Sequence, residues 1–280
     1  VTYKWYTAAT GGTAVGAGTT YTTSTLTSGR SYYVEAVTAA GCASPRAEVA
    51  VTVEPLPATP VADNVNICAG ETATLAVSNA DANLSYRWYD AATDGNLLAT
   101  GDTYTTASLA ASATYFIEAV SGIGCASTSR RAVTVNVTAL PAVPEAENLT
   151  VCAGQAATLW VNNPDPTLYY NWYSGGALVA TGLSYTTDNL SASTTYHLEA
   201  VTNTGTACSS ARRAVTVTVT PAITNNFISN AQTICSGSTP ASLTGSLPNG
   251  GGGNYTYQWE RSEDGVNFTA IANATNQHYT

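Results

Sequence analysis

The chain has few of the residues that build long helices and basic surfaces. Its 280 residues contain no methionine, one lysine (Lys4) and nine Lys and Arg in all, against 18 Asp and Glu, which gives a net charge of −9. There is no basic stripe to neutralise phosphates, which argues against nucleic acid or an anionic membrane surface as a partner. No apolar run approaches the roughly 20 residues needed to cross a bilayer, so membrane insertion is not expected.

Groupings of catalytic and metal-binding residues are also missing. His197 and His278 are the only histidines, no serine lies in a GxSxG elbow, and no glycine-rich motif is placed to cradle phosphate. Six cysteines occur without a CxxC pair, so no repeat gathers four soft ligands for a metal ion. We therefore expect neither an enzyme nor a bound cofactor, and any export signal of a secreted protein would lie outside these residues.

The mix of abundant residues suits strands and turns better than long helices. Thr, Ala, Val, Ser, Gly and Tyr dominate, and 44% of the chain is hydrophobic, which is enough to bury real cores. The composition predicts an all-β protein.

Internal repeats organise the sequence. Cys42, Cys125 and Cys208 recur 83 residues apart, and Cys68, Cys152 and Cys235 form a second series spaced by 84 and 83. Tryptophans recur in step within "YKWY", "YRWY", "YNWY" and "YQWE". The repeats predict four segments: residues 1–55, a partial repeat; 56–139 and 140–219, two complete repeats; and 220–280, a partial repeat.

Each complete repeat reads as seven short strands separated by turn signals. In the second repeat they are "NVNIC", "TATLAV", "SYRWYD", "NLLATG", "TYTTASL", "TYFIEAV" and "RAVTVNV". Seven strands in about 83 residues fit a β-sandwich. Period-two alternation places the recurring tryptophans on the core face. The predicted core tryptophans are Trp5, Trp88, Trp172 and Trp259.

The tryptophan of the third strand, the tyrosine that opens the sixth and the strand count resemble the immunoglobulin-like (Ig-like) superfamily. The pattern "C-x-G … Y-x-W-Y … Y-T-T … G-C … V-x-V" is similar to Ig-like repeats of very large secreted surface proteins of Bacteroidota, including gliding adhesins and type IX secretion cargo. The resemblance spans the whole chain. It implies tandem Ig-like sandwiches in an elongated rod, in which short proline-bearing linkers favour stiffness.

The cysteines are expected to form structural disulfides in an oxidising exterior. Sequence proximity favours Cys68–Cys125 and Cys152–Cys208, each inside one repeat. Cys68, however, lies in the turn before the second strand and Cys125 in the turn after the sixth. In an Ig-like sandwich these two turns lie at opposite ends of the domain. A disulfide tolerates only about 7 Å between Cα atoms. Stacking of successive domains favours Cys68–Cys208, between repeats. The pairing of Cys42, Cys125, Cys152 and Cys235 is then expected with cysteines outside these residues.

Outward-facing aromatic residues are the candidate binding groups. A stripe suited to stacking on sugars or to lateral association is predicted from Tyr6, Tyr89 and Tyr173 beside Tyr33, Phe116 and His197. Ordinary cross-strand packing is the competing explanation. Trp160 stands at an outward position that holds Ala76 and Thr244 in sister repeats. Glu35, Glu118 and Glu199 recur beside Lys4, Arg87 and Asn171, where cross-strand pairing is expected rather than catalysis.

These patterns together predict a structural or adhesive segment of a long extracellular surface protein or fibre. The alternative is a carbohydrate-binding accessory region of a secreted multidomain enzyme. The expected partners are neighbouring repeats of the same protein, together with further copies of it or surface glycans. The expected location is the cell surface or its exterior.

Overall fold

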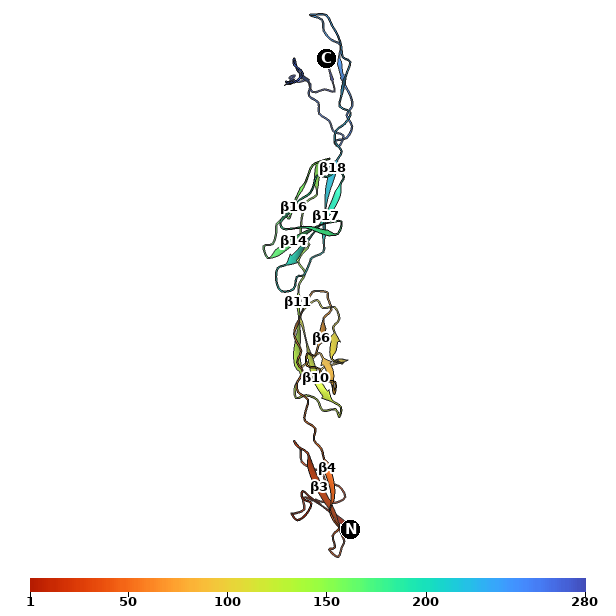
Figure 1. Cartoon of the computed structure of the whole chain (residues 1–280), viewed down its shortest axis with the longest axis vertical. Helices are drawn as coiled ribbons and strands as arrows, with labels where there is room; N and C mark the ends of the chain where they lie inside the picture. Colours follow the sequence, from red (N-terminus) through yellow and green to blue (C-terminus); the bar gives the residue numbers. More distant parts are fainter. The chain divides into compact units, whose positions relative to one another are not determined.

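The computed structural model describes residues 1–280, which form β-strands and no helix. The all-β prediction is therefore confirmed. Each repeat builds its own sheets, and Figure 1 shows them coloured along the chain.

The second repeat contains all seven predicted strands. They are β5 (Val65–Cys68), β6 (Thr74–Ala76), β7 (Leu84–Tyr89), β8 (Leu97–Thr100), β9 (Thr103–Thr105), β10 (Ala113–Ser121) and β11 (Arg131–Thr138). Five of them form a sheet in the order β5-β11-β10-β7-β8, and β6 pairs with β9 in a second, smaller sheet. Strand register places Trp88 beside Ile117 and Tyr86 beside Ala119, and all four are buried. Alternation along β7 and β10 thus builds the core.

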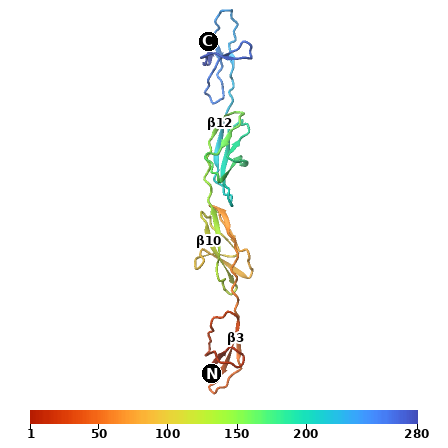
Figure 2. The same ribbon diagram turned by 90° about the vertical axis from the view of Figure 1, so that its left-hand side faces the viewer.

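The third repeat has the same arrangement. Its strands are β12 (Leu149–Cys152), β13 (Thr158–Trp160), β14 (Leu168–Ser174), β15 (Ala177–Thr181), β16 (Ser184–Thr186), β17 (Thr194–Thr202) and β18 (Arg213–Thr220). The larger sheet has the order β12-β18-β17-β14-β15, and the smaller sheet pairs β13 with β16. Figure 2 labels the edge strand β12. Trp172 is fully buried beside Leu198 in a cluster of eleven buried residues.

Residues 1–55 form one sheet, in the order β2-β1-β3-β4. Its strands are β1 (Thr2–Tyr6), β2 (Gly16–Ala17), β3 (Arg30–Val37) and β4 (Ala47–Val51). Trp5 is only partly buried, so the prediction of a core position is wrong for this residue. In the complete repeats a second sheet contributes to the core around the tryptophan, but residues 1–55 have no such pair. Trp5 instead stacks on Tyr21, with 5.9 Å between ring centroids.

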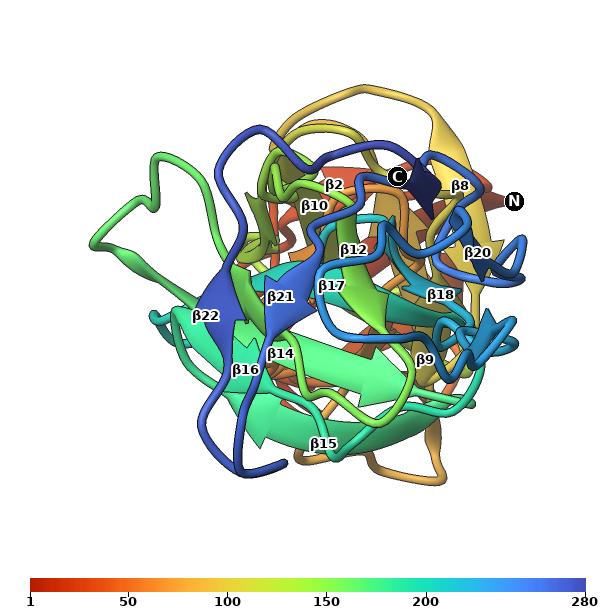
Figure 3. The same cartoon turned by 90° about the horizontal axis from the view of Figure 1, so that it is seen from above.

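The last segment carries short strands in two small sheets. They are β19 (Ile228–Ser229), β20 (Leu243–Gly245), β21 (Glu260–Arg261), β22 (Thr269–Ala270) and β23 (His278–Tyr279). The orders are β19-β20-β23 and β21-β22, and Figure 3 shows β21 next to β22. Trp259 is buried and lies against Tyr279, with 5.7 Å between ring centroids.

Candidate functional site

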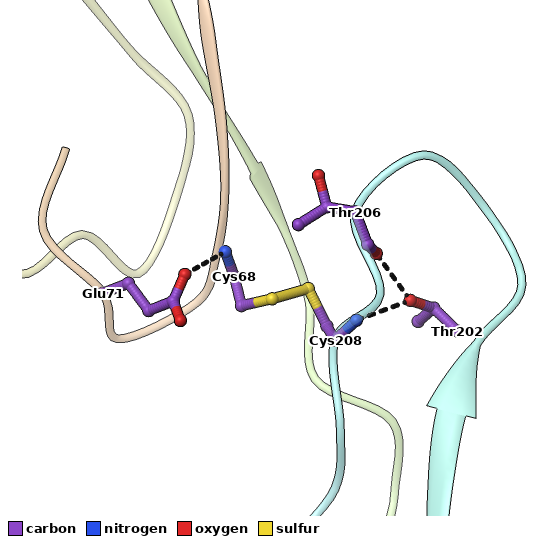
Figure 4. Close-up of a disulfide and its surroundings, with 5 residues drawn as sticks. All are labelled: Cys68, Glu71, Thr202, Thr206 and Cys208. Carbon is purple, nitrogen blue, oxygen red and sulfur yellow. Dashed lines mark hydrogen bonds between the residues drawn. A yellow bond between two sulfur atoms is a disulfide. The ribbon is translucent and has the colours of Figure 1, made fainter. Parts of the chain in front are cut away.

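A disulfide joins Cys68 of the second repeat to Cys208 of the third (Figure 4). The two residues are 140 positions apart in sequence, and their Cα atoms are 5.5 Å apart. Both are buried. The bond therefore ties two successive domains together covalently, which is the between-repeat pairing that strand direction favours.

The Cys68 side of the junction is a tight turn at the end of β5. The amide of Cys68 donates to the Glu71 carboxylate at 2.9 Å, and the amide of Glu71 donates back to the carbonyl of Cys68 at 3.1 Å. Gly70 has a φ of +91°, which favours glycine, and its amide donates to Leu109. The amide of Ala69 donates to the carbonyl of Thr138 in β11. Cys68 is therefore fixed beside the end of the last strand of its repeat.

The Cys208 side is the turn between β17 and β18. The amide of Cys208 donates to the Thr202 hydroxyl at 2.9 Å, and that hydroxyl donates to the carbonyl of Thr206 at 2.8 Å. The amide of Thr202 also donates to the carbonyl of Cys208 at 3.0 Å. These bonds, drawn in part in Figure 4, fix the backbone at Cys208 through contacts within the third repeat.

The within-repeat pairings Cys68–Cys125 and Cys152–Cys208 are not formed, and four cysteines are free: Cys42, Cys125, Cys152 and Cys235. They occupy the same two kinds of turn. The amides of Cys42 and Cys125 donate to the hydroxyls of Thr38 and Ser121, as Cys208 does to Thr202. Cys152 lies in register with Thr220 at the end of β18, as Cys68 lies beside Thr138. Their expected pairing outside these residues stays a prediction.

A cluster of tyrosine, glutamate and arginine recurs in all three Ig-like repeats. We call these clusters the arginine clamps: Tyr6, Glu35 and Arg46; Tyr89, Glu118 and Arg130; Tyr173, Glu199 and Arg212. In each, the tyrosine hydroxyl donates to the glutamate, the arginine Nε donates to the same carboxylate, and the guanidinium lies over the tyrosine ring. The distances from guanidinium carbon to ring centroid are 3.3, 3.3 and 3.6 Å.

The clamps connect distant parts of each domain. Arg130 directly precedes β11, and its guanidinium also donates to the carbonyls of Ala91 and Asp94 in the hairpin between β7 and β8. Arg46 does the same with Ala8 and Gly11. The cross-strand partners expected for the three glutamates, Lys4, Arg87 and Asn171, therefore contact them less closely than the clamp arginines do. Arg87 is 3.9 Å from Glu118, against 3.1 Å for Arg130, and Asn171 donates weakly to Glu199 at 3.4 Å. No ion pair links Lys4 to Glu35.

The clamps change the interpretation of the aromatic stripe. The cross-strand pairs Tyr6–Tyr33, Tyr89–Phe116 and Tyr173–His197 are in register, as expected. However, an arginine covers one face of each clamp tyrosine, and each hydroxyl is bonded. Tyr6 is buried, and Tyr33, Phe116 and His197 are half-buried. One face and the hydroxyl of each clamp tyrosine are therefore already engaged within the domain. By contrast, Trp160 has 60% of its surface exposed.

The charge of Glu199 is stabilised inside its clamp. Burial raises the pKa of Glu199, but hydrogen bonds from Tyr173, Arg212 and Asn171 outweigh burial and leave the pKa below its usual value. The hydrogen bond to Glu199, together with burial, raises the pKa of Tyr173. A depressed carboxyl pKa stabilises the fold above the unfolded pKa, and this contribution disappears as pH falls through the folded pKa.

We therefore expect Glu199→Gln to lower the free energy of unfolding by about 1–2 kcal/mol at neutral pH, with the deficit closing below about pH 4. Urea denaturation of both proteins across this pH range measures the difference. A deficit that stays constant down to pH 3 would show that shape rather than charge is responsible.

The last segment contains a pocket that the sequence did not reveal. Its volume is about 560 Å³, and both aromatic and amide side chains line it, among them Phe227, Tyr255, Trp259, Phe268 and Gln277. The lining residues are scattered from 223 to 277, so no local motif marks them.

No cluster of three or more His, Cys, Asp or Glu side chains is placed to hold a metal ion. The chain has no helix of the length and apolarity that a membrane span requires.

Comparison with known proteins identifies the repeats. The model of a family described as "Ig-like domain CHU_C associated" matches residues 1–55, 57–138 and 141–221. Residues 224–280 match a different model, a domain of unknown function (DUF8696), so the expected Ig-like repeat over 220–280 stays a prediction. A search of curated proteins finds no match.

Several solved structures are distantly similar. Fibronectin(III)-like modules of Clostridium thermocellum CbhA share 12% identity over 59% of this chain and 92% of theirs, with a TM-score of 0.36. The I9–I11 tandem from titin shares 12% identity over 79% of this chain and 88% of its own length, with a TM-score of 0.35. Sidekick-1 immunoglobulin domains 1–4 share 13% identity over 92% of this chain and 76% of their own length, with a TM-score of 0.27. Because three successive matches to the family model together cover most of the chain, the chain belongs to the family of CHU_C-associated Ig-like domains, a Bacteroidota-type family.

Proposed function

We propose that this chain is a structural and adhesive segment of a long extracellular surface protein, whose successive Ig-like domains are stapled by disulfides. The observation that carries the proposal is the bond between Cys68 and Cys208. A covalent bond between two domains restricts how one domain moves against the next. Such restriction suits a stalk that holds a binding surface away from a cell.

The same bond supports an extracellular location. Disulfides persist in oxidising compartments, whereas the cytosol keeps thiols reduced. Each side of the junction is held by hydrogen bonds within its own turn. Four further cysteines in the same kinds of turn support a repeated junction along the protein.

The role that we propose is non-catalytic. Ig-like repeats typically serve as scaffolds, and function resides in sites carried on them. The glutamates that recur in the sixth strand of the Ig-like repeats are engaged in the arginine clamps. There each glutamate has a tyrosine and an arginine as partners.

Thiol trapping in intact source cells tests this proposal. Cells are treated with an alkylating reagent before lysis, and the peptides are mapped by mass spectrometry without reduction. We expect Cys68 and Cys208 to be recovered as one linked peptide pair in nearly all molecules. A cytosolic protein of the same cells, with alkylated cysteines, is the control. Recovery of Cys68 and Cys208 as alkylated thiols would overturn the proposal.

A carbohydrate-binding accessory region is the second candidate function. The pocket of the last segment favours it, because its lining combines aromatic rings with Asn226, Gln258 and Gln277. Rings stack on sugar faces and amides bond hydroxyl groups, as binding sites for small polar ligands require. Binding of the chain to an immobilised polysaccharide would favour this candidate.

A further inference from the structure

The turn that carries Cys208 is tied back to strand β17 at three points. We call these three contacts the turn anchors: Glu199 with Arg212, Ala200 with Ser210, and Thr202 with Cys208. The first is the ion pair of the arginine clamp, with 3.0 Å between Nε of the arginine and the carboxylate. Because Arg212 directly precedes β18, the anchors hold the returning chain from the cysteine to the start of the next strand.

The anchor between Ala200 and Ser210 is buried and doubly bonded. The amide of Ser210 donates to the carbonyl of Ala200 at 2.8 Å, and the amide of Ala200 donates to the Ser210 hydroxyl oxygen at 3.0 Å. The same hydroxyl donates to the carbonyl of Ala211 at 2.8 Å. Ser210 is only 7% exposed, so removing its hydroxyl would leave a buried amide without a partner. Ser210 thus fixes the backbone two residues beyond Cys208.

The same anchors recur in the first and second repeats, where the cysteine is free. They are Glu35 with Arg46, Ala36 with Ser44 and Thr38 with Cys42, and then Glu118 with Arg130, Ala119 with Ser127 and Ser121 with Cys125. In sequence they read "EAVT … CAS … R" and "EAVS … CAS … R", against "EAVT … CSS … R" in the third repeat. Since two of the three turns carry no disulfide, the anchors do not depend on the bond.

The anchors are kept even where the loop before the cysteine differs in length. Five residues separate Thr202 from Cys208 in the third repeat, whereas three separate Ser121 from Cys125 in the second. The amide of the cysteine nevertheless lies 2.9 Å from the hydroxyl in the third repeat and 3.1 Å in the second. The anchors, rather than the loop length, therefore set where the cysteine lies against its strand.

We propose that Ser210 and Arg212 are positioning residues for the bond between Cys68 and Cys208. They hold the backbone at Cys208 before the bond forms, so that Cys68 of the neighbouring domain meets a turn already in its final place. Holding one partner in place raises the effective concentration of the two thiols for each other. This inference rests on the proposed function, in which disulfides staple successive domains, and it adds that each domain folds first and is oxidised afterwards.

The bond forms by thiol–disulfide exchange, for which glutathione disulfide serves as the oxidant. The thiolate of one cysteine attacks glutathione disulfide, which gives a mixed disulfide and releases one glutathione thiolate. The thiolate of the other cysteine attacks the protein sulfur of the mixed disulfide and releases the second glutathione thiolate. Both cysteine sulfurs are oxidised, both glutathione sulfurs are reduced, and the two thiol protons pass to the released glutathiones. The second attack joins two protein groups, so it is the step that the anchors favour.

Redox equilibration of the whole chain in glutathione buffers tests the inference. The free thiols of the oxidised chain are first alkylated, so that only Cys68 and Cys208 respond after reduction. Trapping of thiols and mass spectrometry then give the equilibrium constant for bond formation. We expect Ser210→Ala and Arg212→Gln each to lower this constant about tenfold, which makes the reduction potential about 30 mV less negative. In the oxidised chain the bond itself holds the turn, so the loss of an anchor is felt mainly by the reduced chain.

Ser127→Ala and Arg130→Gln are the matched controls. They remove the same anchors from the turn of Cys125, in the domain that supplies Cys68, and should leave the constant within about twofold of the parent. Hydrogen exchange of β14 peptides verifies that the third repeat of each variant is folded. The Arg212 side chain is 41% exposed, so Arg212→Gln decides the matter if Ser210→Ala does not fold. A constant that stays at the parent value in the folded variants, or that falls equally in the controls, overturns the inference.

Failure of this inference is distinguishable from failure of the proposed function. Thiol trapping in intact cells shows whether the Cys68–Cys208 bond exists, and its absence there overturns the function. A bond that is present in cells, but whose equilibrium constant ignores Ser210 and Arg212, overturns only the positioning role.

Discussion

When pulled from its two ends, the oxidised chain should extend by about 450–500 Å less than the reduced chain. The disulfide spans a sequence separation of 140 residues, and an extended chain measures about 3.3–3.6 Å per residue. Tension passes from β5 through the two sulfur atoms to β18. Nearly all residues of the second and third repeats therefore carry no load. The bond thus prevents the second and third repeats from lengthening when the chain is pulled, although each could otherwise unfold.

Single-molecule force spectroscopy with and without reductant measures this difference. Cys208→Ser should behave like the reduced parent, with the same contour length. Cys152→Ser is the control, because Cys152 is free and its loss should leave the oxidised contour length unchanged. Equal contour lengths for oxidised parent and Cys208→Ser would mean that the bond is not formed in solution.

Trp172→Ala should destabilise the third repeat by about 3–5 kcal/mol, the usual cost of truncating a buried tryptophan. Trp172 is fully buried beside Leu198, and its indole nitrogen donates to the carbonyl of Gly182 at 3.2 Å. The variant loses packing and leaves a cavity between the two sheets. A domain of typical stability would become marginal.

Hydrogen exchange of peptides from β14 and β17 reports this loss domain by domain, as faster exchange by about two to four orders of magnitude. Trp160→Ala is the control within the same repeat, because its exposed ring should change stability by less than about 0.5 kcal/mol. Peptides from β7 and β10 of the second repeat should exchange as in the parent. Unchanged protection of β14 in Trp172→Ala would contradict the packing described above.

Much of the fold is predictable because local signals agree with one another. Alternation in "SYRWYD" and "TYFIEAV" marks strands whose inward residues do form the core, as Trp88 and Ile117 illustrate. Turn residues separate seven strands that all appear in the second repeat. Repetition strengthens each assignment, since the same pattern recurs in the third repeat.

Strand direction did favour the bond between Cys68 and Cys208, but other side-chain contacts between residues distant in sequence were not predictable. Arg130 is 41 residues from Tyr89, and nothing in the spacing indicates that its guanidinium lies over that ring. The glutamate partners were therefore assigned to strand neighbours such as Arg87. Trp5 carries the same motif as Trp88, but its burial depends on a second sheet that residues 1–55 do not form.

The bond between Cys68 and Cys208 also determines what a protease can release. Leu140 and Val143, in the linker between the second and third repeats, are about half exposed and lie inside the ring that the disulfide closes. A cut there opens the ring but does not divide the molecule, because the two fragments remain joined through sulfur. The second and third repeats therefore stay joined after a single cleavage in this linker, and the two fragments separate only when the disulfide is also reduced.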